Sequence, residues 1–315
     1  MKIKETFELA FQNHKKNNFK IAENLYKEIL KIKPNHFESV FYLGALLVQT
    51  KNFDKAKPIL QKVIKIQPDF VRAHNNLGIV FEELGQSQKA MSYFQTAIKI
   101  QPNFANAHYN LGNAFNKLNE FKKAIDCYKK AVKINPNYVA AYNNLGNVFR
   151  ELGEHKKAIS CYEKVTQIQP DSGTAYSNLG VAFKELREFQ KAIDCYEKAV
   201  KINPNYVVAY NNLGSAFQEL NEFKKAIKCY QKAIQNDPNN IDAYDNLGII
   251  LGELGRGDEA KKYFEKSLNL DPNREKTYQR YGELLLKLNQ HSKALPYLRK
   301  GTGFIKFTQE DFKII

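Results

Sequence analysis

The sequence predicts an all-α solenoid of about nine helical hairpins, each 34 residues long. Three residue types recur at that spacing and support this prediction. The recurring prolines are Pro34, Pro68, Pro102, Pro136, Pro170, Pro204, Pro238 and Pro272. Glycine repeats at the same interval from Gly44 to Gly282, and alanine from Ala22 to Ala294. Self-similarity with a period of roughly 20 to 50 residues is typical of stacked repeat architectures, in which each repeat is one supersecondary unit.

The three columns divide the chain into nine repeats. Their bounds are 3–36, 37–70, 71–104, 105–138, 139–172, 173–206, 207–240, 241–274 and 275–308. We therefore expect one repeat array over residues 1–308 and a short C-terminal tail over residues 309–315. A length of 315 residues would by itself suggest about two globular domains. The columns replace that expectation with a single quasi-linear array.

Each repeat begins with a first helix, as the repeat 105–138 illustrates. Its apolar positions are Ala107, Leu111, Gly112 and Phe115. Spacings of three and four residues place these side chains on one face of an α-helix. We expect Gly112 to be small because two helix backbones approach closely there, whereas Phe115 fills a wider space.

A second helix completes the repeat. Its apolar positions are Ala124, Tyr128, Ala131 and Ile134. The polar segment 118–120 joins the two helices into an antiparallel hairpin. Pro136 cannot continue the second helix, and Asn137 is a suitable N-cap for the first helix of the next repeat.

These columns resemble the tetratricopeptide repeat (TPR) family, whose 34-residue repeat carries Leu-Gly, an aromatic residue, Ala, a second aromatic residue, Ala and Pro at fixed offsets. The resemblance covers residues 3–308. It implies a right-handed superhelix in which the first helices line the concave face and the second helices form the convex face. A single hairpin cannot bury its apolar face, so stacking between neighbouring repeats supplies the stability.

The two terminal repeats depart from the pattern. Ala10 replaces the glycine of the first repeat and Asn13 its core aromatic residue, which predicts a polar N-terminal cap. The last repeat has Gly301 in a small-alanine column, and residues 304–307 have weak strand character. The tail either folds back to cap the last hairpin, which we favour, or begins a further domain. Incompletely capped ends also allow a homo-oligomer.

The chain is basic, but its charge does not favour nucleic-acid binding. It has 48 Lys+Arg against 33 Asp+Glu, a net charge of +15. Only seven of the 48 are arginine, the preferred side chain for bidentate contacts with phosphate and guanine. Many lysines form two columns on the second helices, for which we expect a solvated face. The columns are Lys55, Lys89, Lys123, Lys157, Lys191 and Lys225, and Lys130, Lys164, Lys198, Lys232 and Lys266. Docking of this face on nucleic acid or an acidic membrane surface is the alternative.

The sequence carries neither a membrane span nor a secretory signal. No apolar stretch reaches the roughly 18 to 20 residues that a transmembrane helix needs. The first residues lack the apolar core and the cleavage site of a signal peptide. We therefore expect a cytoplasmic protein.

No pattern indicates catalysis, a metal or a cofactor. The cysteines are Cys127, Cys161, Cys195 and Cys229. Because they lie 34 residues apart, they fall on successive second helices, whose roughly 8–10 Å separation exceeds the roughly 7 Å between Cα atoms that a disulfide allows. We expect reduced core residues. Glu82 and Glu83 point about 100° apart on a helix and do not face one substrate atom. The sequence therefore predicts no enzyme activity, no cofactor, no metal site and no small-molecule substrate.

The strongest candidate for a binding site is an asparagine two residues before each central glycine. These residues are Asn76, Asn110, Asn144, Asn178, Asn212 and Asn246. A side-chain amide both donates and accepts, so it can hold a peptide backbone whatever side chains the peptide carries. Neighbouring repeats are roughly 10 Å apart, and an extended peptide advances about 3.3 Å per residue. One asparagine would then meet every third residue of a ligand.

A similar asparagine ladder belongs to the TPR superhelix of the O-linked N-acetylglucosamine transferase, where it holds extended protein segments. By that resemblance the column points into the concave groove. Further asparagines widen the polar floor, namely Asn75, Asn143, Asn211, Asn113 and Asn147. The alternative is that an asparagine before Leu-Gly serves helix packing.

The TPR proteins that bind chaperone tails clamp a carboxylate with a lysine three residues before the glycine. The corresponding residues here are Asn75, Tyr109, Asn143, Ser177, Asn211 and Asp245, none of them lysine. We therefore expect a non-catalytic scaffold that binds extended segments of partner proteins. The alternative is the substrate-recruiting arm of a protein-modifying enzyme, with a glycosyltransferase-like, other transferase or oxygenase domain after residue 315.

Overall fold

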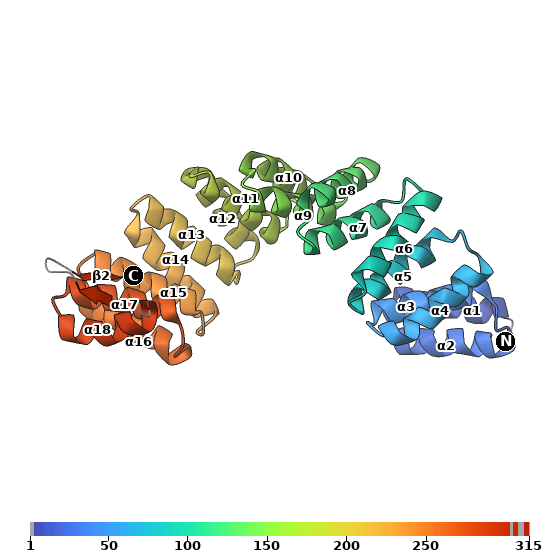
Figure 1. Ribbon diagram of the computed structural model, residues 1–315, viewed down its shortest axis with the longest axis horizontal. Coiled ribbons are helices and arrows are strands. Elements are labelled where there is room, and N and C mark those ends of the chain that lie inside the picture. The colour runs from blue at the N-terminus through green and yellow to red at the C-terminus, as the bar shows by residue number, and fades with distance from the viewer. Residues whose placement is uncertain (1–2, 303–304, 308–311, 315) are drawn as a thin grey trace. The chain divides into compact units, whose positions relative to one another are not determined.

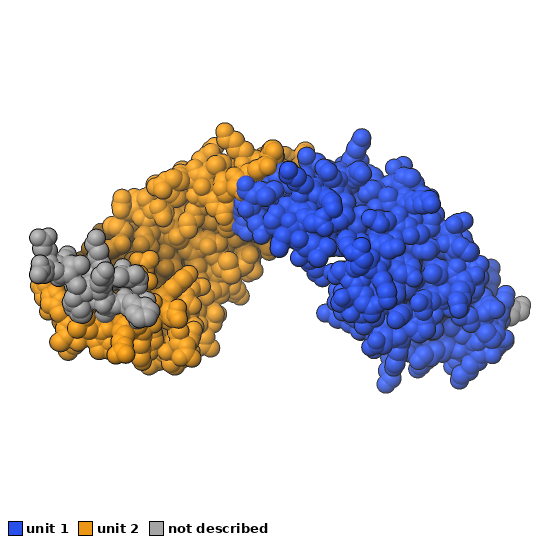
Figure 2. All heavy atoms as spheres, in the orientation of Figure 1, with its two compact units in different colours: residues 1–152 blue, residues 153–315 orange. Residues whose placement is uncertain are grey.

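The computed structural model describes residues 3–302, 305–307 and 312–314, and this part of the chain consists almost entirely of paired antiparallel α-helices (Figure 1). The chain divides into two compact units, Met1–Leu152 and Gly153–Ile315, which Figure 2 colours blue and orange. No helix in the described ranges combines the length and the apolar content that crossing a bilayer requires.

The helices follow one another in hairpins. The helices of unit 1 are α1 (Ile3–Lys15), α2 (Phe19–Ile32), α3 (Phe37–Gln49), α4 (Phe53–Ile66), α5 (Val71–Glu83), α6 (Ser87–Ile100), α7 (Ala105–Lys117), α8 (Phe121–Ile134) and α9 (Val139–Glu151). The elements of unit 2 are α10 (His155–Ile168), α11 (Gly173–Glu185), α12 (Phe189–Ile202), α13 (Val207–Glu219), α14 (Phe223–Asn236), α15 (Ile241–Glu253), α16 (Gly257–Leu270), α17 (Glu275–Lys287), α18 (His291–Thr302), β1 (Ile305–Phe307) and β2 (Phe312–Ile314). Odd-numbered helices are the first helices of the repeats.

Stacking of consecutive helices builds the core of each unit. Within each unit every helix packs against the helix before and after it, and each first helix also contacts the next first helix. The buried side chains are mostly the alanines, leucines and aromatic residues of the repeating columns. The predicted all-α solenoid is therefore confirmed, with one short strand pair added at its end.

A three-residue turn closes each hairpin. Between α7 and α8 this turn is residues 118–120, as predicted. Its middle residue, Asn119, has φ +57°, in the left-handed region that asparagine tolerates better than most residues. The same turn position is left-handed in every repeat, at Asn17, Lys51, Gly85, Asn119, Gly153, Arg187, Asn221, Gly255 and Asn289.

The predicted N-cap at Asn137 is wrong. The N-cap of α9 is the next residue, Tyr138, which makes no capping hydrogen bond with its side chain. Asn137 belongs to the preceding turn, where its backbone N–H donates to Asn135 Oδ1 over 3.1 Å. The turn after Pro136 is thus one residue longer than the sequence interpretation allowed.

The reason that we predicted for the small size of Gly112 is also wrong. A Cβ atom added to Gly112 would lie 2.7 Å from Cε1 of Tyr128, a buried ring of the paired second helix. The side chain of a second helix likewise opposes the glycine in Gly44–Leu60, Gly78–Phe94, Gly180–Tyr196, Gly214–Tyr230, Gly248–Phe264 and Gly282–Leu298. In these repeats the glycine therefore makes room for a side chain of the second helix, and at Gly282 the backbone N of Leu298 also lies 3.1 Å from the added Cβ.

The first repeat, for which the sequence predicts a polar cap, exposes mostly polar residues together with a few aliphatic ones. Ala10 is buried, but Leu9, Ile21 and Ile32 are 40%, 52% and 71% exposed. Three large aliphatic side chains on α1 and α2 therefore face solvent. End-to-end association of copies through such an end stays a prediction.

A short strand pair follows α18. β1 and β2 are antiparallel, with Ile305 opposite Ile314 and Phe307 opposite Phe312. The weak strand character expected over 304–307 corresponds to β1, while residue 304 lies outside the described residues. So do residues 308–311 and 315, on which part of the predicted tail falls.

Candidate functional site

The asparagine column lies on the first helices of six consecutive repeats. Its members are Asn76 on α5, Asn110 on α7 and Asn144 on α9 in unit 1, and Asn178 on α11, Asn212 on α13 and Asn246 on α15 in unit 2. Each is followed by a buried leucine of the core. Because successive helical residues point about 100° apart, each asparagine lies at the edge of the apolar face and is partly exposed.

Two of the six asparagines join neighbouring repeats. Asn110 Nδ2 donates to Asn75 Oδ1 over 2.9 Å, from α7 to α5. Asn144 Nδ2 donates to Asn113 Oδ1 over 2.8 Å, from α9 to α7. An intramolecular hydrogen bond of this kind contributes roughly 0.5–1.5 kcal/mol to stability. The packing role that the sequence leaves open therefore applies to Asn110 and Asn144.

The other four asparagines leave their amides unused. Asn76, Asn178, Asn212 and Asn246 make no side-chain hydrogen bond to any residue in 3–302, 305–307 or 312–314. Each amide therefore has its donor and acceptor groups available to a ligand. The column thus contains two kinds of asparagine that the sequence does not distinguish.

Two of the asparagines expected to widen the polar floor are packing residues. Asn75 is buried and accepts the hydrogen bond from Asn110. Asn113 accepts from Asn144 and also from the Tyr128 hydroxyl, over 2.8 Å. Their acceptor oxygens are therefore already occupied.

The remaining three are placed closer to the surface. Asn143 and Asn211 are partly exposed, and Asn147 is exposed. Asn211 Nδ2 donates to Asn240 Oδ1 over 2.9 Å. The side-chain oxygens of Asn143 and Asn211 are covered and accept no hydrogen bond from the described residues.

A cleft of about 330 Å³ lies between α5 and α7, and we call it the α5–α7 cleft. Its lining residues are Ile79, Glu82, Glu83, Phe94, Asn110, Asn113, Asn116 and Lys117. Asn110 and Asn113 belong to the predicted site, but its charged residues do not. Glu82 and Glu83 both line this cleft, although the sequence considers them only as a catalytic pair.

Glu82 and Lys117 form an ion pair across the α5–α7 cleft. Lys117 Nζ lies 2.7 Å from Glu82 Oε1, and the lysine side chain is 61% exposed whereas the glutamate side chain is 13% exposed. Glu82 Oε2 and Asn116 Oδ1 are covered and have no hydrogen-bond partner in the described part of the chain. Sequence reasoning missed the pair because Glu82 and Lys117 are 35 residues apart. The signal that could have found it is a pair of opposite charges separated by one repeat plus one residue.

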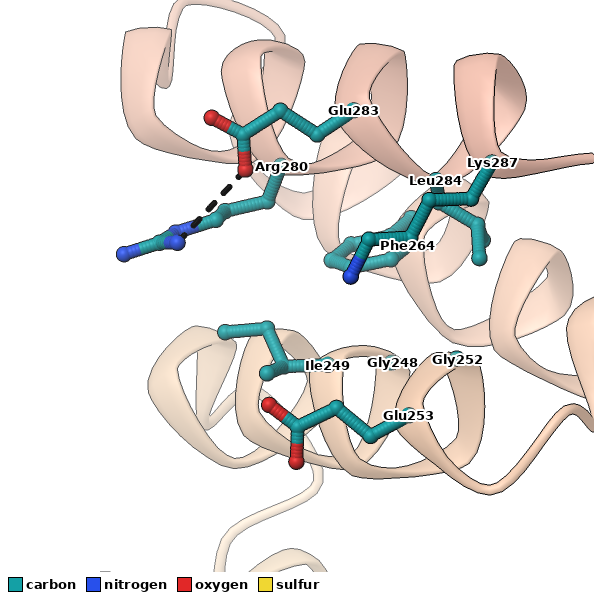
Figure 3. Close-up of a pocket in the computed structure, with 9 residues that line it drawn as sticks. All are labelled: Gly248, Ile249, Gly252, Glu253, Phe264, Arg280, Glu283, Leu284 and Lys287. Carbon is teal, nitrogen blue, oxygen red and sulfur yellow. Dashed lines mark ion pairs between the residues drawn. The ribbon is translucent and has the colours of Figure 1, made fainter.

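The equivalent cleft between α15 and α17, which we call the α15–α17 cleft, is smaller, about 70 Å³ (Figure 3). Its lining residues are Gly248, Ile249, Gly252, Glu253, Phe264, Arg280, Glu283, Leu284 and Lys287. Arg280 stands where Asn110 stands in the α5–α7 cleft, two residues before a central glycine. Its guanidinium pairs with Glu283 of the same helix, with Nη1 3.5 Å from Oε2, opposite Ile249 and Glu253 in Figure 3.

A lysine of the chain also occupies the contact between α11 and α13. Lys184 Nζ donates to Ser215 Oγ over 2.7 Å. Burial lowers the pKa of Lys184, and the nearby carboxylates of Glu219 and Glu185 oppose this effect. Unit 2 therefore places its own cations at two contacts between first helices.

An aromatic cluster occupies the first two repeats, where the asparagine column is absent. Tyr42 stands two residues before Gly44, in the asparagine position of the second repeat. Its ring centroid lies 4.8 Å from that of Phe11 and 5.9 Å from that of Phe7. All three rings are partly exposed. A tyrosine in the asparagine column is the sequence signal for this cluster, and our prediction did not use it.

The second helices carry a solvated lysine column with local ion pairs. Lys123, Lys157, Lys191 and Lys225 are exposed and pair with Glu120, Glu154, Glu188 and Glu222, respectively. Exposed pairs of this kind contribute about 0–1 kcal/mol each. The pairing places a carboxylate beside each of these lysines and lowers the positive charge that the column presents.

Reactive groups are scarce in the described residues. No three His, Cys, Asp or Glu side chains converge in a way that could hold a metal ion. The four cysteines are buried thiols. Burial raises the pKa of Cys127 and Cys195 to about 11 and that of Cys229 to about 12. A thiol that stays protonated at neutral pH is a poor nucleophile.

Every protein-family model that matches this chain describes the same kind of repeat. Models described as TPR repeat or tetratricopeptide repeat match residues 14–77, 71–104, 93–126, 112–153, 138–203, 207–240, 229–262 and 275–304. No curated protein matches the chain.

Several solved structures resemble this chain. A MamA protein is 33% identical, over 54% of this chain and 92% of its own, with a TM-score of 0.50. YrrB, a TPR protein with an unusual peptide-binding site, is 19% identical over 58% of this chain and 95% of its own, with a TM-score of 0.52. A chain of the APC/C hetero-tetramer Cut9–Hcn1 is 19% identical over 85% of this chain and 52% of its own, with a TM-score of 0.57. The last two likenesses concern the fold alone.

Proposed function

Because the chain belongs to the tetratricopeptide repeat family, whose repeats build protein-interaction scaffolds, we propose that it binds extended segments of partner proteins along its first helices. In this proposal the scaffold is not catalytic, and the partner's backbone is held by side-chain amides. The asparagine column supplies these amides once per repeat.

The observation that carries the proposal is the set of unused amides. In unit 2, three consecutive first helices each present one of them, at Asn178, Asn212 and Asn246. Asn76 presents another on α5 of unit 1. A donor and an acceptor at one-repeat intervals match a backbone that offers N–H and C=O groups every 3.3 Å or so. Such contacts do not depend on the partner's side chains.

The test replaces the four unused asparagines, in the variant N76A/N178A/N212A/N246A. Asn110 and Asn144 are left in place because their loss would also weaken packing. The wild-type chain and the variant are used for affinity capture from a lysate of cells that produce the protein, with quantitative mass spectrometry of bound proteins. Loss of four hydrogen bonds should lower partner recovery at least about tenfold.

A matched control changes four asparagines that lie in the turns after the repeat-ending prolines. The control variant is N103A/N137A/N205A/N239A, and all four side chains are exposed. It has the same composition as the ladder variant and should capture the same partners as the wild type. Equal recovery of those partners by the ladder variant would contradict the proposal.

A further inference from the structure

The α5–α7 cleft holds a carboxylate whose hydrogen bonding is incomplete. Lys117 pairs with Glu82 Oε1 only, over 2.7 Å. Glu82 Oε2 is covered by the protein and has no partner in the described residues, as is true of Asn116 Oδ1 nearby in the cleft lining. A covered acceptor without a donor is costly, by roughly 1–3 kcal/mol and more when charged. The cleft is therefore short of hydrogen-bond donors.

We propose that the α5–α7 cleft binds the guanidinium group of an arginine in a partner segment, in exchange for the Lys117 ammonium. The inference rests on the proposed function, because the rest of that segment is held by the asparagine column. The site would add a preference for one side chain to a binding surface whose other proposed contacts are with the partner's backbone.

The geometry of the two cations explains why arginine is favoured over the resident lysine. An ammonium is a point charge on a flexible stem, whereas a guanidinium presents five N–H donors in a planar fork. The fork can donate to both oxygens of Glu82 and still reach a further acceptor such as Asn116 Oδ1. This chain forms such a fork elsewhere: Arg256 Nε and Nη2 lie 2.7 Å from Glu259 Oε1 and Oε2.

The cleft also offers a surface for the arginine stem. Ile79 and Phe94 line it beside the polar residues. An arginine side chain buries its methylene groups against apolar neighbours while its charged end reaches polar ones. The displaced Lys117 side chain is already 61% exposed, so its ammonium moves into water without further unfolding of the site.

Other contacts between first helices already contain a cation of this chain. Arg280 lines the α15–α17 cleft and pairs with Glu283. Lys184 is half-buried between α11 and α13 and donates to Ser215. In the α5–α7 cleft the only resident cation, among the described lining residues, is held by one oxygen of Glu82. Among these three contacts, the α5–α7 cleft is the one with a covered carboxylate oxygen that has no partner in the described residues.

The test uses the full chain and fluorescein-labelled Gly-Ser peptides with one central variable residue: arginine, lysine or citrulline. Citrulline keeps the shape of arginine but carries no charge. Fluorescence anisotropy gives the dissociation constants. For the wild-type chain we expect the arginine peptide to bind about tenfold more tightly than the citrulline peptide, and more tightly than the lysine peptide. Glu82→Gln should abolish the preference.

Lys117→Met should change the affinity for the arginine peptide in the opposite direction to Glu82→Gln. It keeps the stem length, removes the competing ammonium, and should tighten binding of the arginine peptide by about threefold. Glu28→Gln, an exposed site on α2, changes the net charge as Glu82→Gln does and should leave the preference intact. Retention of the preference in Glu82→Gln, or weaker arginine binding in Lys117→Met, overturns the inference.

The ladder variant N76A/N178A/N212A/N246A separates this inference from the proposed function. If it weakens all three peptides equally and the wild type shows no arginine preference, the inference fails and the proposed function stands. If it changes nothing while Glu82→Gln removes a clear preference, the arginine site stands and the proposed function fails. Absence of binding by every peptide at about 1 mM overturns the inference.

Discussion

The α5–α7 cleft and the α15–α17 cleft lie between equivalent helices of their repeats, yet they differ in size and charge. In the first, Asn110 stands before the central glycine and the cleft is about 330 Å³. In the second, Arg280 stands there and the cleft is about 70 Å³. The first has a covered glutamate oxygen without a partner, whereas in the second the arginine pairs with Glu283. One backbone arrangement thus yields in unit 1 a larger cleft whose glutamate is paired through one oxygen only, and in unit 2 a smaller cleft whose arginine is paired within its own helix.

The difference shows that residues lining the clefts between first helices can change while the glycine contact of the repeat core stays the same. The glycine and the ring opposite it, such as Gly78 with Phe94 and Gly248 with Phe264, are the same kind of contact in both places. The residue two positions before the glycine lies outside that contact. It is an asparagine in the α5–α7 cleft (Asn110) and an arginine in the α15–α17 cleft (Arg280). Binding properties therefore cannot be inferred from the match to the repeat pattern alone.

The helices beside the two clefts are also joined in different ways. Asn75 of α5 accepts one hydrogen bond, from Asn110. Asp245 stands at the same repeat position in α15 and accepts from Ser267 Oγ at 2.6 Å, Thr277 Oγ1 at 2.8 Å and Arg274 Nε at 2.9 Å. These donors come from α16, from α17 and from the residue before α17. The buried carboxylate therefore connects three helices, whereas the amide connects two.

The largest expected effect follows from this contrast. Asp245→Ala removes the acceptor for two buried hydroxyls and one guanidinium, and should lower the free energy of unfolding by about 3 kcal/mol. Asn75→Ala removes one acceptor and should cost about 1 kcal/mol. Urea unfolding followed by far-ultraviolet circular dichroism measures both. Equal costs for the two variants would show that the extra hydrogen bonds of Asp245 add nothing.

The fold could be predicted from the sequence because every local signal is repeated. The turn at residues 118–120 follows from a break in apolar spacing that recurs in each repeat. The errors concern neighbours in space: the Tyr128 ring over Gly112 and the cap at Tyr138 depend on how the turns and helices pack. The spacing of a column locates its members along a helix but does not say which atom faces them.

The candidate site was predictable only in part for the same reason. The column locates Asn110 and Asn178 equally well, yet Asn110 donates to Asn75 whereas Asn178 has no side-chain partner in the described residues. Asn75 stands 35 residues before Asn110, and an asparagine, Asn143, stands at the same spacing before Asn178. The residue types in the columns therefore do not say which amide is used for packing.

The second prediction compares the thiols of the two units. Folding raises the pKa of Cys195 and Cys229 in unit 2, and of Cys127 in unit 1, from 9.0 to about 11, 12 and 11 by burial. The folded state then keeps protons that the unfolded state releases above pH 9. The stability from each thiol is complete below pH 9 and is lost as the pH rises toward its folded pKa.

At about pH 10 each of these thiols should have lost about 1 kcal/mol of its contribution. Between about pH 8 and pH 10, the stability of C195A/C229A should therefore fall by about 2 kcal/mol less than that of the wild type, and that of C127A by about 1 kcal/mol less. Urea unfolding at the two pH values measures these differences. An unchanged pH dependence in both variants would mean that the thiols titrate alike in the folded and unfolded chain.

The third prediction converts the α15–α17 cleft into a copy of the α5–α7 cleft. Arg280→Asn removes one of its two lining cations and leaves Lys287 where α7 has Lys117, and Gly252→Glu places a carboxylate where α5 has Glu82. A Cβ at Gly252 would lie 2.9 Å from Leu284 Cδ1, so the end of that side chain must shift. Replacing a helical glycine offsets part of this cost by about 0.5–1 kcal/mol.

The double variant G252E/R280N should bind a second arginine peptide with an affinity within about tenfold of the first site, because the carboxylate and the cleft are then both present. Isothermal titration calorimetry of the full chain would show the stoichiometry rising from one to two. G252Q/R280N has the same shape without the charge and should stay at one. A stoichiometry of one for both variants would mean that a carboxylate beside an open cleft is insufficient, and that the Asn116 and Asn113 side chains, which the α15–α17 cleft lacks, are needed to complete the site.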